Sequence, residues 1–392
     1  MSNYLPLARK YRPSKFADLV GQEALTKTLS YAILNNKISQ SYLLSGIRGI
    51  GKTTSARIIA KTINCTGPIE SEGLVSACEQ CHNCISFSKN NHPDIVEIDA
   101  ASSTGVDDVR AVLESAEYKP LIGKFKVFII DEVHMFSKSA FNAMLKTLEE
   151  PPKSVIFILA TTELNKIPIT IISRCQRFDL RRLDSSEVMG LLKKIAGQED
   201  IKYEDSALEL IALKSDGSAR DGLSMLDQAA SLSQGEESYS GIVTLNLVQE
   251  MIGAGGLDVV VEYTKAIWAK DVDKALGVLG QIYLKTSDIL SFFESVIDVI
   301  GYAAKIRSID KYQSAIYTSH DANIRNSIAN LDIAHLTVLW QIFTHGIQEL
   351  KNSHNQLLTA EILSIKAIYA TTLPSPSEVV ELTMQSRLPR RS

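Results

Sequence analysis

Short apolar runs separated by amphipathic stretches dominate the first half of the chain. Four runs predict buried strands because each is a continuous apolar segment with polar limits: Ser41–Ser45, Asp94–Asp99, Lys126–Asp131 and Val155–Ala160. Stretches with helical periodicity lie between them, such as Thr54–Asn64. Strands that alternate with helices favour a parallel, doubly wound α/β sheet.

The pattern becomes helical throughout near Leu183. Asp184 and Glu187 stand at the spacing of a capping box, which predicts a helix that begins between them. Helical periodicity continues to about Leu232 and is followed by the polar stretch Ser233–Gly241. This part of the chain therefore predicts a small helical lid.

A second helical region extends from about Ile242 to Tyr369. Apolar residues repeat at helical spacing along two of its segments. They are Ile289, Leu290, Phe293, Val296, Ile297 and Ile300 in the first, and Leu336, Leu339, Trp340, Phe343 and Ile347 in the second. We expect both stripes to face a core, and only secondarily an oligomer interface.

Composition limits the function classes. The 392 residues are 45% hydrophobic, which suffices for two or three domains with cores. The sequence has no apolar run of membrane-spanning length, and Met1–Arg12 lacks the apolar segment of a signal peptide, so we expect a cytoplasmic protein without membrane contact. The net charge is −4, so nucleic-acid binding would depend on local basic patches.

A phosphate-binding motif follows the first predicted strand. It reads Gly46-Ile47-Arg48-Gly49-Ile50-Gly51-Lys52-Thr53 and matches G-x-x-x-x-G-K-[ST] between a strand and a helix. Backbone N–H groups of such a loop surround phosphate oxygens at a helix N-terminus. We expect all of these residues and Thr54 to contact a nucleoside triphosphate. Lys52 would reach the β- and γ-phosphates, and the Thr53 hydroxyl would bind Mg²⁺.

Two carboxylates end the third predicted strand. Asp131 is placed to hold the Mg²⁺ shell, and Glu132 to act as the general base toward the attacking water. Acidic residues after strands also serve as helix N-caps, which is the alternative reading. Together with the phosphate motif, they favour hydrolysis of the nucleotide.

Four of the five cysteines are clustered. Cys65, Cys78, Cys81 and Cys84 form the pattern C-x12-C-x2-C-x2-C. In a cytosolic chain this clustering favours a metal over disulfides, and four thiolates suit tetrahedral Zn²⁺. An iron–sulfur cluster is the competing assignment. His82 and His92 are possible alternate ligands, whereas Cys175 stands apart.

Several motifs in order resemble those of one family, the γ/τ subunits of the bacterial DNA polymerase III clamp loader, within the AAA+ class of ATPases. The likeness covers residues 4–370. Besides the phosphate motif and the cysteine insert, it rests on Ala8–Pro13 (ARKYRP), Phe16–Gln22 (FADLVGQ), Asp131–His134 (DEVH), Ala160–Thr162 (ATT), Ser173–Cys175 (SRC) and Gly217–Asp221 (GSARD).

The resemblance implies roles for further residues. The adenine pocket would be lined by Tyr11, Arg12 and Val20. Thr162 would be sensor 1, which holds the γ-phosphate or the attacking water, and Arg220 would be sensor 2. Arg174 would be an arginine finger that acts on the ATP of a neighbouring subunit. Lys52, Asp131 and Glu132 complete the expected catalytic set.

The fold implied by the resemblance is an AAA+ P-loop parallel sheet with a zinc-binding insert, followed by two helical parts. We expect the ATPase domain at 1–182 with the zinc module at about 65–84, the lid at 183–241, an all-helical collar for oligomerisation at 242–370 and a disordered tail at 371–392.

The implied function is that of a clamp-loader motor, which opens a sliding clamp and loads it on primer–template DNA, with ATP, Mg²⁺ and Zn²⁺ as cofactors. Expected partners are the δ and δ′ subunits, further copies of this chain, the clamp and the polymerase III core. The chain would belong to a DNA-directed DNA polymerase holoenzyme without a polymerase active site or a τ-like extension of its own.

Two alternatives and one DNA hypothesis complete the expectations. A AAA+ remodeller or helicase-like motor usually has an aromatic pore loop, and we identify none in the sequence. A non-hydrolysing scaffold like δ′ conflicts with the intact Lys52, Thr53, Asp131 and Glu132. Ser102–Val106 precedes a predicted helix, so its N–H groups and hydroxyls could hold a DNA backbone phosphate, although a plain helix cap explains them equally well.

Overall fold

The computed structural model describes residues 4–102, 106–235, 241–252, 257–285 and 289–370. The tail expected to be disordered, 371–392, lies outside these ranges. The chain forms two compact units, 1–200 with 211–228 and 201–210 with 229–392. Within the described ranges, no helix combines the length and the apolar character needed to cross a bilayer.

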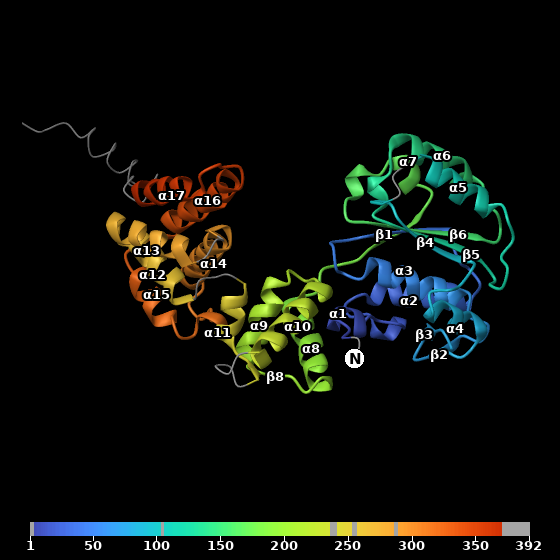
Figure 1. The fold of residues 1–392 in the computed structure, drawn as a ribbon, viewed down its shortest axis with the longest axis horizontal. Helices are drawn as coiled ribbons and strands as arrows, with labels where there is room; N and C mark the ends of the chain where they lie inside the picture. Colours follow the sequence, from blue (N-terminus) through green and yellow to red (C-terminus); the bar gives the residue numbers. More distant parts are fainter. Residues whose placement is uncertain (1–3, 103–105, 236–240, 253–256, 286–288, 371–392) are drawn as a thin grey trace, which may run out of the picture. The chain divides into compact units, whose positions relative to one another are not determined.

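A five-stranded parallel sheet is the centre of the first unit (Figure 1). The strand order is β4-β5-β6-β1-β7. The strands are β1 (Ser41–Ser45), β4 (Ile95–Asp99), β5 (Lys126–Asp131), β6 (Val155–Thr161) and β7 (Gln176–Asp179). This confirms the predicted parallel α/β sheet. Because β5, β6 and β1 are parallel neighbours, the segments that follow these three strands meet at one edge of the sheet.

Helices cover both faces of this sheet (Figure 1). One face carries α2 (Glu23–Leu34) and α3 (Lys52–Ile63), and the other carries α5 (Val106–Ala116), α6 (Lys138–Glu149) and α7 (Ile169–Ile172). The core on the second face includes Phe128 and Phe157, which stack with ring centroids 5.4 Å apart. Burial of such rings supplies much of the free energy that holds helices on a sheet.

The cysteine-containing insert leaves the end of α3. It consists of a hairpin, β2 (Ile69–Ser71) with β3 (Leu74–Ser76), and a short helix, α4 (His82–Ser88). The hairpin packs on α2, where the Ser30 hydroxyl accepts a hydrogen bond from the Val75 N–H at 3.1 Å. The apolar pattern did not predict this hairpin because β2 is exposed along its whole length.

The expected capping box begins α8 (Ser185–Gln198). The Asp184 carboxylate accepts the Glu187 N–H at 2.8 Å, and the Glu187 carboxylate accepts the Asp184 N–H at 3.0 Å. Two helices follow, α9 (Asp205–Lys214) and α10 (Ala219–Gly235).

The expectation of helices alone after Leu183 is wrong in one detail. The two-residue strands β8 (Lys202–Tyr203) and β9 (Ile242–Val243) pair in parallel in the second unit. Segments this short have no periodicity that a sequence pattern could reveal.

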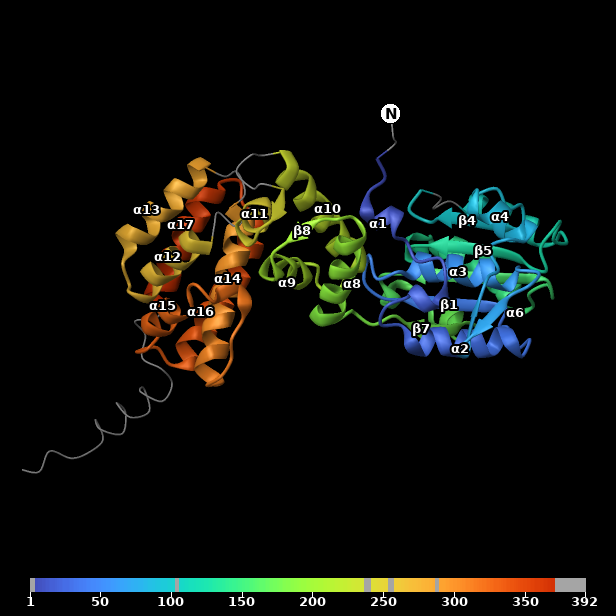
Figure 2. The ribbon, with the colours of Figure 1, turned by 90° about the horizontal axis from the view of Figure 1, so that it is seen from below.

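The second unit is otherwise built from helices (Figure 2). Besides residues 205–210 of α9 and 229–235 of α10, they include α11 (Leu245–Met251), α12 (Leu257–Trp268), α13 (Val272–Lys285), α14 (Ile289–Ser308), α15 (Asp321–Ser327), α16 (Ile333–Lys351) and α17 (Gln356–Ala370). The buried Tyr263 ring meets Phe292 and Phe293 edge-on, and its hydroxyl lies 2.5 Å from the Ser364 hydroxyl.

The two predicted apolar stripes lie on α14 and α16. Phe293, Val296 and Ile300 are fully buried, as expected of core residues. Trp340 differs from the expectation, since it is 42% exposed.

Candidate nucleotide site and metal centre

The phosphate motif forms a tight loop between β1 and the first residue of α3. Gly49 and Gly51 adopt φ angles of 75° and 104°, which residues with a Cβ rarely adopt. A Cβ built on Gly49 would lie 2.1 Å from the Ser218 hydroxyl oxygen of the lid. The glycine pattern of the motif therefore reflects both backbone conformation and close approach of the lid.

Lys52 is buried, with 4% of its surface exposed. Its Nζ donates hydrogen bonds to the carbonyl oxygens of Gly46 and Ile47, both at 3.0 Å. Burial lowers the pKa of Lys52, while the nearby Glu132 and Asp131 act in the opposite direction. The ammonium group thus lies inside the curve of the loop, where phosphate oxygens would offer it stronger acceptors.

Thr53 and Asp131 are brought together from α3 and β5. The Thr53 hydroxyl donates to Asp131 Oδ2, and the other carboxylate oxygen accepts the Glu132 N–H at 3.0 Å. A hydroxyl and a carboxylate side by side are the oxygen ligands that Mg²⁺ takes in P-loop sites.

Glu132 and Thr162 are joined at the ends of β5 and β6. Glu132 has a φ of 46°, unusual for a residue other than glycine, and this turns the chain sharply after the strand. Its Oε2 accepts hydrogen bonds from the Thr162 hydroxyl at 3.0 Å and from the Thr162 N–H at 3.3 Å. The expected base and the expected sensor are therefore in direct contact.

Backbone atoms of the lid also touch the loop. The Arg220 N–H donates to the Gly49 carbonyl at 3.3 Å, near the start of α10. The first two residues of the Gly217–Asp221 motif make further contacts. The Gly217 carbonyl accepts the Leu183 N–H at 3.2 Å, and Ser218 lies against Gly49 of the P-loop.

Of the three residues expected around adenine, Arg12 contacts the P-loop helix, whereas Tyr11 bonds to the end of α8 and Val20 is partly exposed. The Arg12 Nε donates to the Thr54 hydroxyl at 3.0 Å, so this arginine reaches the P-loop helix. The Tyr11 hydroxyl donates instead to the Glu199 carboxylate, at the end of α8. Val20 is 37% exposed in the segment before α2.

Arg174 lies away from the residues above. It precedes β7, and β7 runs parallel to β1 with Gln176 opposite Tyr42. Arg174 is therefore at the amino edge of the sheet, whereas the P-loop leaves the carboxyl edge, a separation of roughly 17 Å for about five residues of strand. Its guanidinium contacts the Thr170 carbonyl at 2.7 Å and pairs with Glu149.

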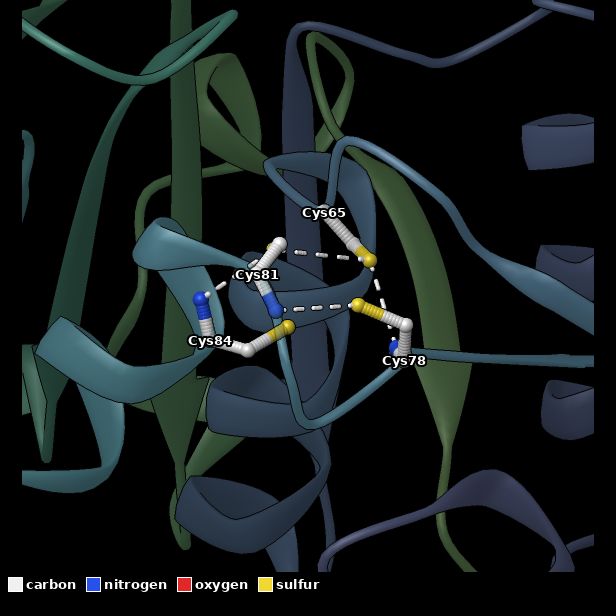
Figure 3. Close-up of side chains that lie close together, drawn as sticks. All are labelled: Cys65, Cys78, Cys81 and Cys84. Atoms are coloured by element: carbon white, nitrogen blue, oxygen red, sulfur yellow. Dashed lines mark hydrogen bonds between the residues drawn. The ribbon is translucent and has the colours of Figure 1, made fainter.

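The four clustered cysteines converge from the segment just after α3, the loop after β3 and the start of α4 (Figure 3). Their Sγ atoms all lie within 4.8 Å of one another. Sulfur ligands about 2.3 Å from a tetrahedral ion lie about 3.8 Å from one another. The observed sulfur positions are close to that spacing, so this donor set fits a single metal ion.

Backbone N–H groups support the sulfurs. The Cys78 N–H points at Cys65 Sγ at 3.2 Å, and the Cys81 N–H points at Cys78 Sγ at 3.3 Å. Burial alone would raise the pKa of Cys81, but hydrogen bonds from Thr66 and Cys84 outweigh it and lower the pKa to about 5. Thiolates are the form that binds metal.

The other candidate ligands are not part of this cluster. Burial raises the pKa of Cys175 to about 11, as for an unreactive thiol. His82 is exposed, and His92 is buried in the loop after α4, where its Nδ1 accepts the Asp94 N–H at 3.2 Å. Of the segment considered for DNA phosphate, residues 103–105 lie outside the described ranges.

Three polar residues near the site, His134, Ser45 and Asp179, have no role among the motifs described above. His134 lies 3.1 Å from the Thr161 hydroxyl and 3.3 Å from Glu163, and the Ser45 hydroxyl donates to Asp179 just before the P-loop. The position of His134 within the Asp131–His134 motif was the available signal. For Ser45 and Asp179 there was none, because 134 residues separate them.

Comparisons with known proteins agree with these features. Residues 21–184 match the family model described as "DNA polymerase III, delta subunit", 187–235 match "DNA polymerase III clamp loader subunit, ATPase lid domain", and 243–382 match "DNA polymerase III subunits gamma and tau domain III". The DNA polymerase III subunit gamma of Buchnera aphidicola (subsp. Acyrthosiphon pisum) is 37% identical over 94% of this chain and 99% of its own length. The chain belongs to the gamma/tau family of DNA polymerase III subunits. This confirms the resemblance inferred from the motifs.

Longer members of the gamma/tau family are equally similar. DNA polymerase III subunit tau is 37% identical in Bacillus subtilis and 34% identical in Escherichia coli K12, over 97% and 96% of this chain. The chain spans 66% and 57% of the lengths of these two tau proteins. Solved structures of RuvB from Thermotoga maritima reach a TM-score of 0.47 at 20% identity, over 65% of this chain and 79% of theirs, which is too distant to support an argument.

Proposed function

We propose that this chain is an ATP-hydrolysing motor subunit of a clamp loader, acting in the cytoplasm as part of the DNA polymerase III holoenzyme. The observation that carries the proposal is the meeting of Lys52, Thr53, Asp131, Glu132 and Thr162 at one edge of the sheet. A phosphate-binding loop, a pair of Mg²⁺ ligands and a carboxylate base are the parts that hydrolysis of a nucleoside triphosphate requires.

In this proposal the N–H groups of the loop, Lys52 and Arg220 bind the phosphates. Thr53 and Asp131 would hold Mg²⁺, which supplies charge neutralisation at the phosphate oxygens when bound. Glu132 accepts the proton of the attacking water, and Thr162 orients that water or the γ-phosphate. Arg12, with Tyr11 and Val20, would lie on the adenine side, an assignment supported by the contact of Arg12 with Thr54.

We assign Arg174 to the ATP site of a neighbouring copy. Its place at the amino edge of the sheet supports this, since its own P-loop is at the opposite edge. Its guanidinium is partly exposed, where it pairs with Glu149. A cation delivered from outside stabilises the charge on the transferring phosphoryl group and makes hydrolysis depend on assembly.

The cysteine cluster is proposed to hold Zn²⁺ through Cys65, Cys78, Cys81 and Cys84. All four ligands are thiolates, so no position is left for water and the role is structural. The position of the insert after the C-terminal end of α3, far from the start of that helix at Lys52, supports a role remote from the chemistry.

The partners proposed are δ and δ′ subunits, further copies of this chain, the polymerase III core, a sliding clamp and primer–template DNA. We propose that residues 242–370 form the collar that assembles these subunits, with the ATPase domain at 1–182 and the lid at 183–241. ATP binding would organise the assembly and open the clamp, and DNA would trigger hydrolysis and release.

Steady-state ATP hydrolysis tests the proposal. The chain, assembled with partner subunits, clamp and primer–template DNA, should hydrolyse ATP faster than it does alone, and a labelled clamp should become linked to circular primed DNA. ATP turnover without clamp loading would favour another AAA+ motor, and ATP binding without turnover would favour a scaffold.

A further inference from the structure

His134 is a buried polar residue to which the proposed reaction assigns no step. It lies in the one-turn helix η2 (Val133–Met135), directly after the sharp turn at Glu132. Only 6% of its side chain is exposed. A polar ring is costly to bury unless its nitrogens are satisfied, so its hydrogen-bond partners indicate why it is there.

The two ring nitrogens meet the last residue of β6 and the turn that follows it. Nδ1 lies 3.1 Å from the Thr161 hydroxyl, and Nε2 lies 3.3 Å from Glu163 Oε1. The Thr161 oxygen also accepts the Glu163 N–H at 3.0 Å, so one hydroxyl links the imidazole ring to the turn.

Thr162 stands between the two partners of His134. It is the residue whose hydroxyl and N–H both donate to Glu132 Oε2. His134 Nδ1 itself lies 3.4 Å from that same oxygen. The imidazole therefore fixes the turn on both sides of Thr162 and packs against the carboxylate that Thr162 holds.

We propose that His134 is a positioning residue that holds Thr162 and Glu132 in one arrangement, so that the base and the sensor act on the attacking water as a unit. The inference rests on the proposed ATPase function and adds a residue to it. The carboxylate oxygen of a general base must lie within hydrogen-bond reach of the attacking water. A misplacement of 1 Å can lower the rate about 100-fold.

The test compares three variants in the full chain, assembled as for the wild type. His134→Leu fills a similar volume without hydrogen bonds, and should lower kcat between about 10- and 100-fold while ATP affinity changes by less than about twofold. His134→Asn keeps an amide that can meet Thr161, and should turn over ATP faster than His134→Leu. Lys37→Gln changes an exposed residue of the first unit that has no role in the proposed site or in the collar, and should match the wild type.

A second background separates positioning from general damage to the fold. If His134 acts through Glu132, adding His134→Leu to Glu132→Gln should cause little further loss of the residual turnover. A loss as large as in the wild-type background would overturn the inference, as would wild-type kcat in His134→Leu or equal rates in the Leu and Asn variants.

The wild type separates this inference from the proposed function. If the wild-type assembly hydrolyses ATP and His134→Leu does so equally well, only the positioning role fails. If the wild-type assembly does not hydrolyse ATP, the proposed function fails and the role of His134 fails with it.

Discussion

At the scale of single residues, Glu132 and Lys52 make separable contributions at one edge of the sheet. Glu132→Gln keeps the size of the side chain and an oxygen that can accept from Thr162, but removes the proton acceptor. We expect ATP binding to persist while turnover falls by a factor of about 10² or more. Equilibrium binding of a fluorescent ATP analogue and steady-state hydrolysis, measured on the same preparation, check this.

Lys52→Ala is the counterpart, because it removes a cation that lies inside the phosphate loop. Here the affinity for the analogue itself should fall. Near-normal DNA-stimulated hydrolysis by Glu132→Gln would show that another group is the base.

Asp94 has a structural role that the sequence did not indicate. The apolar pattern predicted only that it begins a strand. Its side chain is buried and accepts N–H groups of Leu121, Ile122 and Gly123 at 2.7–2.8 Å. Burial alone would raise the pKa of Asp94, but these hydrogen bonds outweigh it and lower the pKa. We expect Asp94→Asn to cost about 2 kcal/mol or more at pH 7.

The pH dependence of that loss has a defined sign. A carboxyl whose pKa is lowered by folding stabilises the native state above its unfolded pKa, about 3.9, and this contribution disappears as the pH falls through the lower folded value. Urea unfolding should therefore show a gap between wild type and Asp94→Asn that narrows below about pH 4. Asp310→Asn, at an exposed position, is the control and should show no gap. A gap that widens on acidification would contradict the assignment.

Residues contiguous in sequence were the predictable part of the site. The P-loop, Asp131 and Glu132 could be predicted because their motifs are local and the edge of a parallel sheet brings them together. The contact of Arg12 with Thr54 and the approach of Ser218 to Gly49 could not, since they join segments far apart in sequence. Such contacts depend on how the lid and the N-terminal segment pack.

At the scale of elements, the insert between α3 and β4 should depend on its metal. Loss of a thiolate ligand removes metal-binding free energy that is also folding free energy. We expect Cys81→Ser to lower the zinc content and to destabilise the insert by several kcal/mol. Elemental analysis of the purified protein and hydrogen exchange of residues 65–88 measure both effects.

Cys175→Ser is the matched control, because this thiol stands outside the cluster. It should keep one zinc per chain. Iron in place of zinc would favour the competing cluster assignment, and wild-type protein with four free thiols and no metal would contradict a metal centre.

Elements with strong apolar runs were predictable, and polar ones were not. The strands β1, β5 and β6 are buried almost throughout, so their hydrophobicity marked them. The fifth strand, β7, reads Gln-Arg-Phe-Asp and lies at the edge of the sheet, largely exposed. An edge strand packs against one neighbour only, so its composition need not be apolar.

At the scale of the whole molecule, we propose that each chain contributes to two ATP sites. It supplies the P-loop of its own site and the arginine finger of a neighbour's site. The P-loop lies at the carboxyl edge of the sheet, and Arg174 lies at the amino edge. The isolated chain should therefore hydrolyse ATP slowly, and assembly should accelerate hydrolysis. In other P-loop systems an arginine finger raises kcat by about 10³–10⁵. This dependence distinguishes the account from that of a self-contained ATPase.

The most direct test mixes two inactive variants in one assembly. Arg174→Ala subunits keep their P-loop, and Lys52→Ala subunits keep their arginine finger. If the finger acts across subunits, some interfaces in mixed assemblies pair an intact P-loop with an intact Arg174, and DNA-stimulated ATP hydrolysis should return. Mass measurement of the complexes establishes that both variants are present. Mixed assemblies that remain as inactive as either variant alone would place Arg174 in its own subunit's site and contradict the account.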